Sequence, residues 1–140
     1  MYDLLIIGAG PAGLTAGLYA ARARLKVLVL ERLGPGGQVL NTDWVENYPG
    51  FPDGISGFEL ADKMKTQAEN FGLTIQNEEA VGLELLPEKK MVTTHSSRME
   101  TKALILACGA TPKKLGIEGE DLLIGKGVSY CATCDGPFYR

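Results

Sequence analysis

The sequence has no long hydrophobic run. None of its apolar stretches approaches the roughly 20 residues that a membrane-spanning helix requires. The N-terminus also lacks the basic segment of a secretory signal peptide, and its first apolar run breaks at Gly8 and Gly10. We therefore expect a cytoplasmic protein with no membrane partner.

An excess of charge of one sign is also missing. The net charge is -3, and the densest basic group, Arg22, Arg24 and Lys26, lies at an expected helix end. This balance gives no electrostatic reason to expect nucleic acid as a partner. The acidic run at residues 118–121 is expected to form a solvated face.

Histidine and cysteine, the usual ligands of structural zinc, are few, with one histidine and three cysteines in the chain. A zinc site built on Cys131 and Cys134 needs two more ligands, and only His95 and Cys108 remain, neither of them paired. We therefore predict no metal site. In a cytoplasmic protein, a Cys-x-x-Cys motif is more often catalytic or metal-binding than a structural disulfide.

What the sequence contains is enough for an ordinary globular domain, because 140 residues of which 45% are hydrophobic can bury a core. Residues 4–7 form an apolar run that ends at glycine, the pattern of a strand buried on both faces. Residues 12–24 predict a helix after Pro11, and residues 26–30 predict a second strand that ends at Glu31. This order is a βαβ unit with a right-handed crossover.

The remaining segments extend this α/β pattern. A loop rich in glycine and proline at residues 32–56 is typical of a binding loop. A helix is predicted at 57–71, a parallel strand at 73–75, antiparallel strands of a small added sheet at 80–85 and 91–95, and an apolar strand at 103–107. We therefore predict a Rossmann-like α/β fold: a parallel sheet with helices, plus a small antiparallel β-meander.

The string Gly8-Ala9-Gly10-Pro11-Ala12-Gly13 fits the dinucleotide-binding pattern G-x-G-x-x-G. It follows a predicted strand and opens a predicted helix, and Glu31 comes 18 residues after Gly13. In such a motif the first glycine permits a tight turn, the second lets the backbone approach a pyrophosphate, and the third lets the helix pack close to the strand. The helix N-terminus attracts the phosphates, and Glu31 can accept hydrogen bonds from a ribose diol.

Two further features favour FAD over a nicotinamide dinucleotide. Gly36-Gly37-Gln38 lies in the long loop just past the second strand, where a flavin nucleotide needs a backbone clamp. Ala107-Cys108-Gly109-Ala110 places another glycine at the carboxyl edge of the sheet, where ligands of open α/β sheets bind.

The motif Cys131-Ala132-Thr133-Cys134 is the chemical centre of the chain. Two cysteines at this spacing at a helix start can form a small, easily reduced disulfide, and the helix dipole can favour a nucleophilic thiolate. Asp135 follows directly and offers a carboxylate for proton transfer. The pattern therefore favours thiol–disulfide exchange.

Together, these motifs resemble the successive landmarks of the low-molecular-weight, bacterial-type thioredoxin reductases. They occur in the order of that family and span essentially the whole chain. The matching strings begin at Gly8, Gly36, Val45 (Val-Glu-Asn-Tyr-Pro-Gly), Ala107 and Cys131. The resemblance implies a cytoplasmic homodimer in which electrons pass from NADPH to FAD, then to the cysteine pair and then to thioredoxin.

The resemblance also implies the role of single residues. Cys134 would exchange electrons with the flavin, Cys131 would attack the thioredoxin disulfide, and Asp135 would be the acid-base group. The residues that it places at FAD are Gly8, Gly10, Pro11, Ala12, Gly13, Glu31, Gly36, Gly37, Gln38, Asn47, Ala80, Ala107 and Gly109.

The sequence departs from that family in two ways. Cys108 stands where the family usually has threonine, and we expect it to be a buried core cysteine. The family's second glycine fingerprint and its returning FAD-domain segment are also absent, so we expect a fragment that is inactive alone. Residues 1–115 would form the N-terminal part of the FAD-binding domain, and residues 116–140 a linker and the start of the NADPH and disulfide domain.

Two other functions stay open at this point. A related flavoprotein that reduces a peroxiredoxin has the same fold but usually carries an extra N-terminal domain and other residues between the cysteines. A non-catalytic nucleotide-binding module would keep the fingerprint but has no use for Cys131, Cys134 and Asp135 together. The electron donor is open as well, because some relatives accept electrons from ferredoxin or a deazaflavin.

Overall fold

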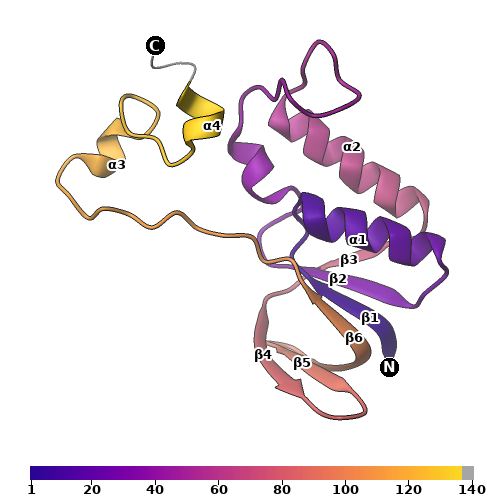
Figure 1. The fold of residues 1–140 in the computed structure, drawn as a ribbon. Coiled ribbons are helices and arrows are strands. Elements are labelled where there is room, and N and C mark those ends of the chain that lie inside the picture. The colour runs from indigo at the N-terminus through magenta and orange to yellow at the C-terminus, as the bar shows by residue number, and fades with distance from the viewer. Residues whose placement is uncertain (137–140) are drawn as a thin grey trace. The chain divides into compact units, whose positions relative to one another are not determined.

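The computed structural model describes residues 1–136, apart from the side chains of Thr133 and Cys134. The chain divides into two compact units, Met1–Gly109 and Ala110–Arg140 (Figure 1). The larger unit carries the sheet and two long helices, and the smaller unit carries the cysteine motif.

The larger unit is built on a six-stranded sheet with the strand order β3-β2-β1-β6-β5-β4. The strands are β1 (Tyr2–Ile7), β2 (Val27–Glu31), β3 (Thr74–Asn77), β4 (Ala80–Leu85), β5 (Lys90–Thr94) and β6 (Arg98–Leu106). β3, β2, β1 and β6 are parallel, whereas β4, β5 and β6 form an antiparallel meander. The predicted fold class, a parallel sheet with a small antiparallel meander, is therefore confirmed.

Strand β6 belongs to both parts of the sheet, because its first half pairs with β5 and most of its length pairs with β1. The sequence predicted only residues 103–107 as a strand and treated the antiparallel sheet as separate. Residues 98–102 were missed because charged side chains alternate there with Met99 and Thr101. Those two residues supply the period of a half-buried strand: Met99 packs on the core and Thr101 is fully buried.

Two helices, α1 (Pro11–Arg22) and α2 (Gly57–Asn70), contact each other and lie on the same side of the sheet (Figure 1). Pro11 suits the first turn of α1, where a missing N–H costs nothing. Ser56 caps α2, since its hydroxyl oxygen accepts a hydrogen bond of 3.1 Å from the Glu59 N–H. No helix in residues 1–136 is both long and apolar enough to cross a membrane.

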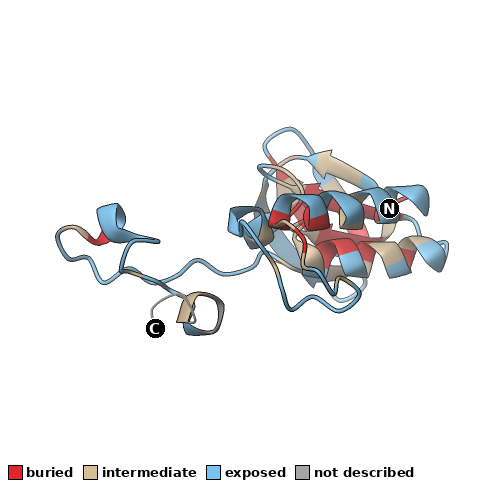
Figure 2. Cartoon of the chain, turned by 90° about the horizontal axis from the view of Figure 1, so that it is seen from above, coloured by how far each residue is buried: buried red, intermediate tan, exposed pale blue. Residues whose placement is uncertain are grey.

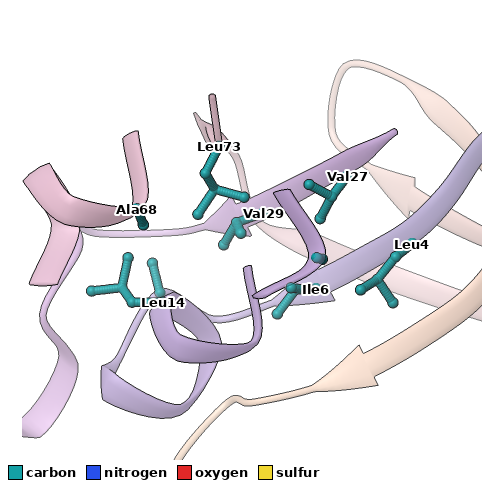
Figure 3. Packing of buried hydrophobic residues seen from close by; sticks show 9 residues of the cluster. Leu4, Ile6, Leu14, Val27, Val29, Ala68 and Leu73 are labelled. Carbon is teal, nitrogen blue, oxygen red and sulfur yellow. The ribbon is translucent and has the colours of Figure 1, made fainter. Parts of the chain in front are cut away.

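Apolar side chains form one cluster on each face of the sheet. The cluster between the sheet and the helices contains Leu4, Ile6, Ala9, Leu14, Ala20, Val27, Val29, Ala68 and Leu73 (Figure 3). The cluster on the other face contains Leu5, Leu28, Leu30 and Val92. This separation follows from the alternation of side chains along each strand. In Figure 2 the buried residues are concentrated where the helices face the sheet.

The long loop between β2 and α2 contains short ordered pieces. A 3-10 helix, η1 (Gly37–Asn41), lies near its start, and an isolated bridge joins Val45 to Ile55. Trp44 packs directly on Gly54, where an added Cβ would lie 2.3 Å from the indole nitrogen. The loop is therefore ordered partly by its own side chains, as in compact surface loops.

The smaller unit contains two short helices, α3 (Glu120–Leu123) and α4 (Ala132–Asp135). Between them, Ile124 and Val128 form an isolated bridge, and the Val128 N–H donates to the Leu123 carbonyl oxygen at 2.9 Å. Cys131 immediately precedes α4. The predicted position of the cysteine motif at a helix start is thus confirmed for its backbone.

Candidate functional site

The fingerprint glycines join β1 to α1, and two of them are required by the protein's own packing. Gly8 has a φ of 102°, and a Cβ added there would lie 2.3 Å from the Ala107 carbonyl oxygen. A Cβ added at Gly13 would lie 1.8 Å from the Gly8 carbonyl oxygen. Gly8 therefore allows β6 to approach the turn, and Gly13 allows α1 to lie against it, as the motif predicts.

Gly10 is different, because no neighbouring atom of the protein requires a glycine there. Its φ is −71°, and an added Cβ would have only the Gly37 Cα within 4 Å, at 3.9 Å. It is the N-cap of α1, and no side chain caps this helix end. The first-turn N–H groups are therefore open to an anion, and a glycine here leaves space for that anion to approach. This cradle fits the pyrophosphate of a dinucleotide.

The second glycine motif lies directly against the first. The Gly36 N–H donates to the Ala9 carbonyl oxygen at 2.8 Å. Gly36 and Gly37 both have positive φ values, 131° and 59°, and a Cβ added at Gly37 would lie 3.1 Å from the Gly10 Cα. Two motifs separated by more than twenty residues in the sequence therefore meet at the N-terminal end of α1.

Glu31 at the end of β2 fastens this turn to the sheet. Its Oε2 accepts from the Ala9 N–H at 2.8 Å, and its Oε1 accepts from the Leu33 N–H at 3.0 Å. Partial burial acts to raise the pKa of this carboxyl, but the backbone N–H groups of Ala9, Leu33, Gly34 and Arg32 together outweigh it, so the pKa lies below its usual range. Each oxygen of an ionised carboxylate can accept more than one hydrogen bond, so a ribose diol would share the Glu31 oxygens with these N–H groups.

The other predicted FAD residues are spread more widely. The Ala107 N–H donates to the Ile7 carbonyl oxygen at 2.8 Å, and Gly109 has a φ of 70° with open space at its Cα. Asn47 lines a shallow hollow in the long loop, and Ala80 begins β4. The atoms nearest to a Cβ added at Gly8, Gly10 or Gly13 come from Gly8, Gly37, Ala107 and Cys108, and none comes from Asn47 or Ala80.

The prediction that Cys108 is a buried core cysteine is wrong. Cys108 is an exposed free thiol just past the end of β6, and its Sγ lies 3.8 Å from the Ile7 carbonyl oxygen. The chain leaves the sheet at this point, so the residue no longer has a strand neighbour to cover it. Its hydrophobic sequence context indicated burial because the apolar run continues up to Ala107.

The cysteine motif of the smaller unit lies in a turn held by polar contacts. The Asp135 N–H donates to the Cys131 carbonyl oxygen at 2.9 Å, which places these residues on successive turns of one helix face. The Ser129 hydroxyl donates to the Asp135 carboxylate and accepts from the Cys131 N–H at 3.0 Å. Sequence reasoning missed Ser129, although a serine two residues before a turn is a known local capping pattern.

The expectation that the acidic run forms only a solvated face is wrong for Glu120. Its exposed fraction is 3%, and its two carboxylate oxygens accept from the Leu115 and Gly116 N–H groups at 2.8 and 2.7 Å. The Tyr130 hydroxyl donates to the same carboxylate. Because Tyr130 immediately precedes Cys131, Glu120 anchors the start of the cysteine turn.

The Glu120 contact predicts an unusual tyrosine titration. The hydrogen bond to Glu120, followed by burial and the nearby negative charges, raises the pKa of Tyr130 to about 12. The stability that this bond adds is present below the ordinary tyrosine pKa of about 10 and is lost as the pH rises through 12. Absorbance at 295 nm during alkaline titration should show one of the five tyrosines ionising late.

The variants Glu120→Gln and Tyr130→Phe check this assignment. Glu120→Gln removes the charge that holds the phenol neutral, so the late step should move toward a pH of about 10. Tyr130→Phe should delete the step without moving the rest of the titration. A wild-type protein in which all tyrosines titrate together would contradict the Glu120–Tyr130 contact.

Comparison with known proteins gives the class of this chain. Residues 2–140 match the family described as pyridine nucleotide-disulphide oxidoreductase, and the chain belongs to that family. It is 50% identical over 139 residues to the thioredoxin reductase of Treponema pallidum and 50% identical over 140 residues to that of Listeria monocytogenes. These matches cover 99% and 100% of this chain but only 45% and 44% of the relatives. The chain thus spans less than half the length of these curated relatives.

The structural comparisons agree with the sequence comparisons. The crystal structure of thioredoxin reductase from Streptococcus pyogenes matches with a TM-score of 0.89 and 48% identity, over 100% of this chain and 45% of that one. The thioredoxin reductase of Lactococcus lactis in its FR conformation matches with a TM-score of 0.82 and 46% identity, over 100% and 46%. The fold is that of the N-terminal, FAD-binding part of a bacterial-type thioredoxin reductase.

Proposed function

We propose that the whole protein is a thioredoxin-disulfide reductase and that this chain supplies its first FAD-binding part and its redox-active cysteine pair. The observation that carries the proposal is the presence of two features in one chain. The larger unit has an open helix start at Gly10 and Gly37 that would suit a dinucleotide, and the smaller unit has a Cys-x-x-Cys turn with an adjoining carboxylate. A nucleotide-binding module alone has no use for the second feature.

In the larger unit, the residues act by binding and orientation. The N–H groups at the start of α1 would hold the pyrophosphate of FAD, and Glu31 would hold its ribose. The remaining FAD contacts are proposed at Gly8, Pro11, Ala12, Gly13, Gly36, Gln38, Asn47, Ala80, Ala107 and Gly109. FAD, once bound, supplies two-electron transfer between a pyridine nucleotide and a disulfide.

In the smaller unit, the residues carry the disulfide chemistry. Cys131 is disulfide-bonded in the structure, which supports a pairing with Cys134 in the oxidised protein. In the reduced protein the Cys131 thiolate would attack the thioredoxin disulfide, and Cys134 would then displace reduced thioredoxin and restore the Cys131–Cys134 bond. Asp135 is the proposed acid-base group.

The assembly, location and domain division are proposed on the same resemblance. A cytoplasmic homodimer with NADPH as its electron donor is the reading that the thioredoxin reductase relatives support. Residues 1–115 would belong to the FAD-binding domain, and residues 116–140 to a linker and the start of the NADPH and disulfide domain. A ferredoxin-flavin thioredoxin reductase from Clostridium acetobutylicum, which matches with a TM-score of 0.73 and 37% identity, favours reduced ferredoxin as the second candidate donor.

The test is an electron-transfer assay on the product of the complete gene, purified with FAD. We expect NADPH oxidation, followed at 340 nm, to require oxidised thioredoxin. Oxidised peroxiredoxin in place of thioredoxin tests the related flavoprotein, and reduced ferredoxin in place of NADPH tests the second donor. A protein that reduces no disulfide substrate with either donor would be a nucleotide-binding module, and the proposal would be wrong.

A further inference from the structure

One hydroxyl joins the backbone of Cys131 to the carboxylate of Asp135. The Ser129 Oγ accepts the Cys131 N–H at 3.0 Å and donates its own hydrogen to the Asp135 carboxylate. Both bonds are satisfied in one geometry, because a hydroxyl has one donor and two acceptor sites. The Asp135 carboxylate is therefore tied to the backbone of the cysteine that precedes it by four residues.

The segment that carries Ser129 is itself fixed. Its next residue, Tyr130, donates its hydroxyl to the Glu120 carboxylate, and Glu120 is buried with both oxygens also accepting backbone N–H groups. Later in the sequence, the Asp135 N–H donates to the Cys131 carbonyl oxygen. The Ser129 hydroxyl thus connects two segments that are fixed separately. The segment before Cys131 is fixed by the Tyr130–Glu120 contact, and the turn at Asp135 is fixed by its own backbone hydrogen bond.

We propose that Ser129 is a positioning residue of the cysteine turn (residues 131–135). Its hydroxyl holds the Asp135 carboxylate on the helix face that also carries Cys131. This inference rests on the proposed function. The inference goes beyond the proposed function because it assigns a role to Ser129, a residue outside the Cys-x-x-Cys-Asp motif.

The chemical consequence concerns one proton. When a thiol of the pair is activated, its S–H bond breaks, the proton moves to a carboxylate oxygen of Asp135, and the electron pair stays on sulfur. The reverse transfer occurs when that thiolate leaves as a thiol. Ser129 gains and loses no proton in either direction; it fixes where the carboxylate receives the proton. Without it, the partly buried Asp135 side chain has several rotamers available, so the carboxylate has no single position at which to receive the proton.

The test measures how fast iodoacetamide alkylates each cysteine of the reduced protein across a pH range, with mass spectrometry to separate the sites. A fixed carboxylate beside a thiol disfavours the thiolate, so Asp135→Asn should lower the midpoint pH of the alkylation profile by about one unit. Ser129→Ala should lower it in the same direction by about half as much, because the carboxylate is released but still present. Ser129→Thr keeps the hydroxyl and should match the wild type.

A matched control is Ser96→Ala, which removes a serine hydroxyl that donates to Glu78 at 2.7 Å in the larger unit. It should leave the profile unchanged. If Ser129→Ala does not fold, Ser129→Val and Ser129→Thr make the same comparison with equal side-chain volume. A Ser129→Ala or Ser129→Val profile that overlaps the wild type would overturn the proposal, as would an Asp135→Asn profile that does not move.

Failure of this inference and failure of the proposed function give different results. If Ser129 has no positioning role, its variants keep the wild-type alkylation profile while the protein still reduces thioredoxin. If the proposed function is wrong, the wild-type protein reduces no disulfide substrate, whatever the alkylation profile of its variants.

Discussion

Replacement of Gly13 by alanine is expected to lower the free energy of unfolding of the larger unit by roughly 3 kcal/mol or more. An added Cβ would lie 1.8 Å from the Gly8 carbonyl oxygen and 2.9 Å from its carbonyl carbon. These are backbone atoms, which cannot rotate away as a side chain could. α1 would have to move off the turn, and that movement would open the cluster formed by Leu14 and its neighbours.

Gly10→Ala is the matched control, because it adds the same methyl group three residues earlier in the same motif. Gly10 has an ordinary φ and only the Gly37 Cα within 4 Å of an added Cβ. We expect a stability change within about 1 kcal/mol, since only an N-cap preference is lost. In the product of the complete gene, the same methyl group should weaken FAD binding at least about tenfold, because it occupies the approach to the α1 N-terminus.

Urea denaturation followed by circular dichroism measures the first effect, and titration of the apoprotein with FAD measures the second. The two variants should separate cleanly: Gly13→Ala affects folding, and Gly10→Ala affects binding. A Gly13→Ala protein as stable as the wild type would show that α1 does not lie as close to Gly8 as the structure has it. A Gly10→Ala protein that loses stability but keeps its FAD affinity would show that Gly10 does not line the pyrophosphate site.

The parts of the fold that the sequence predicted well are those fixed by local patterns. The strand, glycine string and helix from residue 4 to residue 24 are contiguous, so the turn at Gly8 and the start of α1 could be placed from spacing alone. Gly72 likewise ends α2 with a φ of 87°, as a glycine after a helical pattern predicts. In both cases the physical cause lies within a few residues of its effect.

The parts that could not be predicted depend on partners far away in the sequence. Gly8 is needed for its positive φ, which the local turn explains, and also because Ala107 approaches it, and no pattern near Gly8 contains that second requirement. Glu120 lies in an acidic run that is otherwise typical of a solvated surface, and it is buried because Tyr130 and two backbone N–H groups converge on it. A buried carboxylate is tolerated only where such partners exist, and which residues become its partners depends on the fold of the segment rather than on a local sequence pattern.

The second large effect is expected at the cysteine pair, in the product of the complete gene with FAD bound. Substitution of either cysteine by serine should lower thioredoxin reduction by at least about a thousandfold, because a disulfide needs both sulfurs to form and break. The two variants should nevertheless differ in their spectra. If Cys134 faces the flavin, Cys131→Ser leaves a Cys134 thiolate against the oxidised ring system, which gives a long-wavelength charge-transfer band.

Cys134→Ser should lack that band and should instead form a stable mixed disulfide between Cys131 and thioredoxin, visible on a non-reducing gel. The assignment is motivated by position. Asp135 follows Cys134 directly in the sequence, whereas Cys131 lies at the start of the turn, next to Ser129 and Tyr130. The double substitution is the control and should show neither signal. Spectra that come out the other way round would exchange the roles of Cys131 and Cys134, and the absence of a band in both single variants would mean that neither thiolate rests against the flavin.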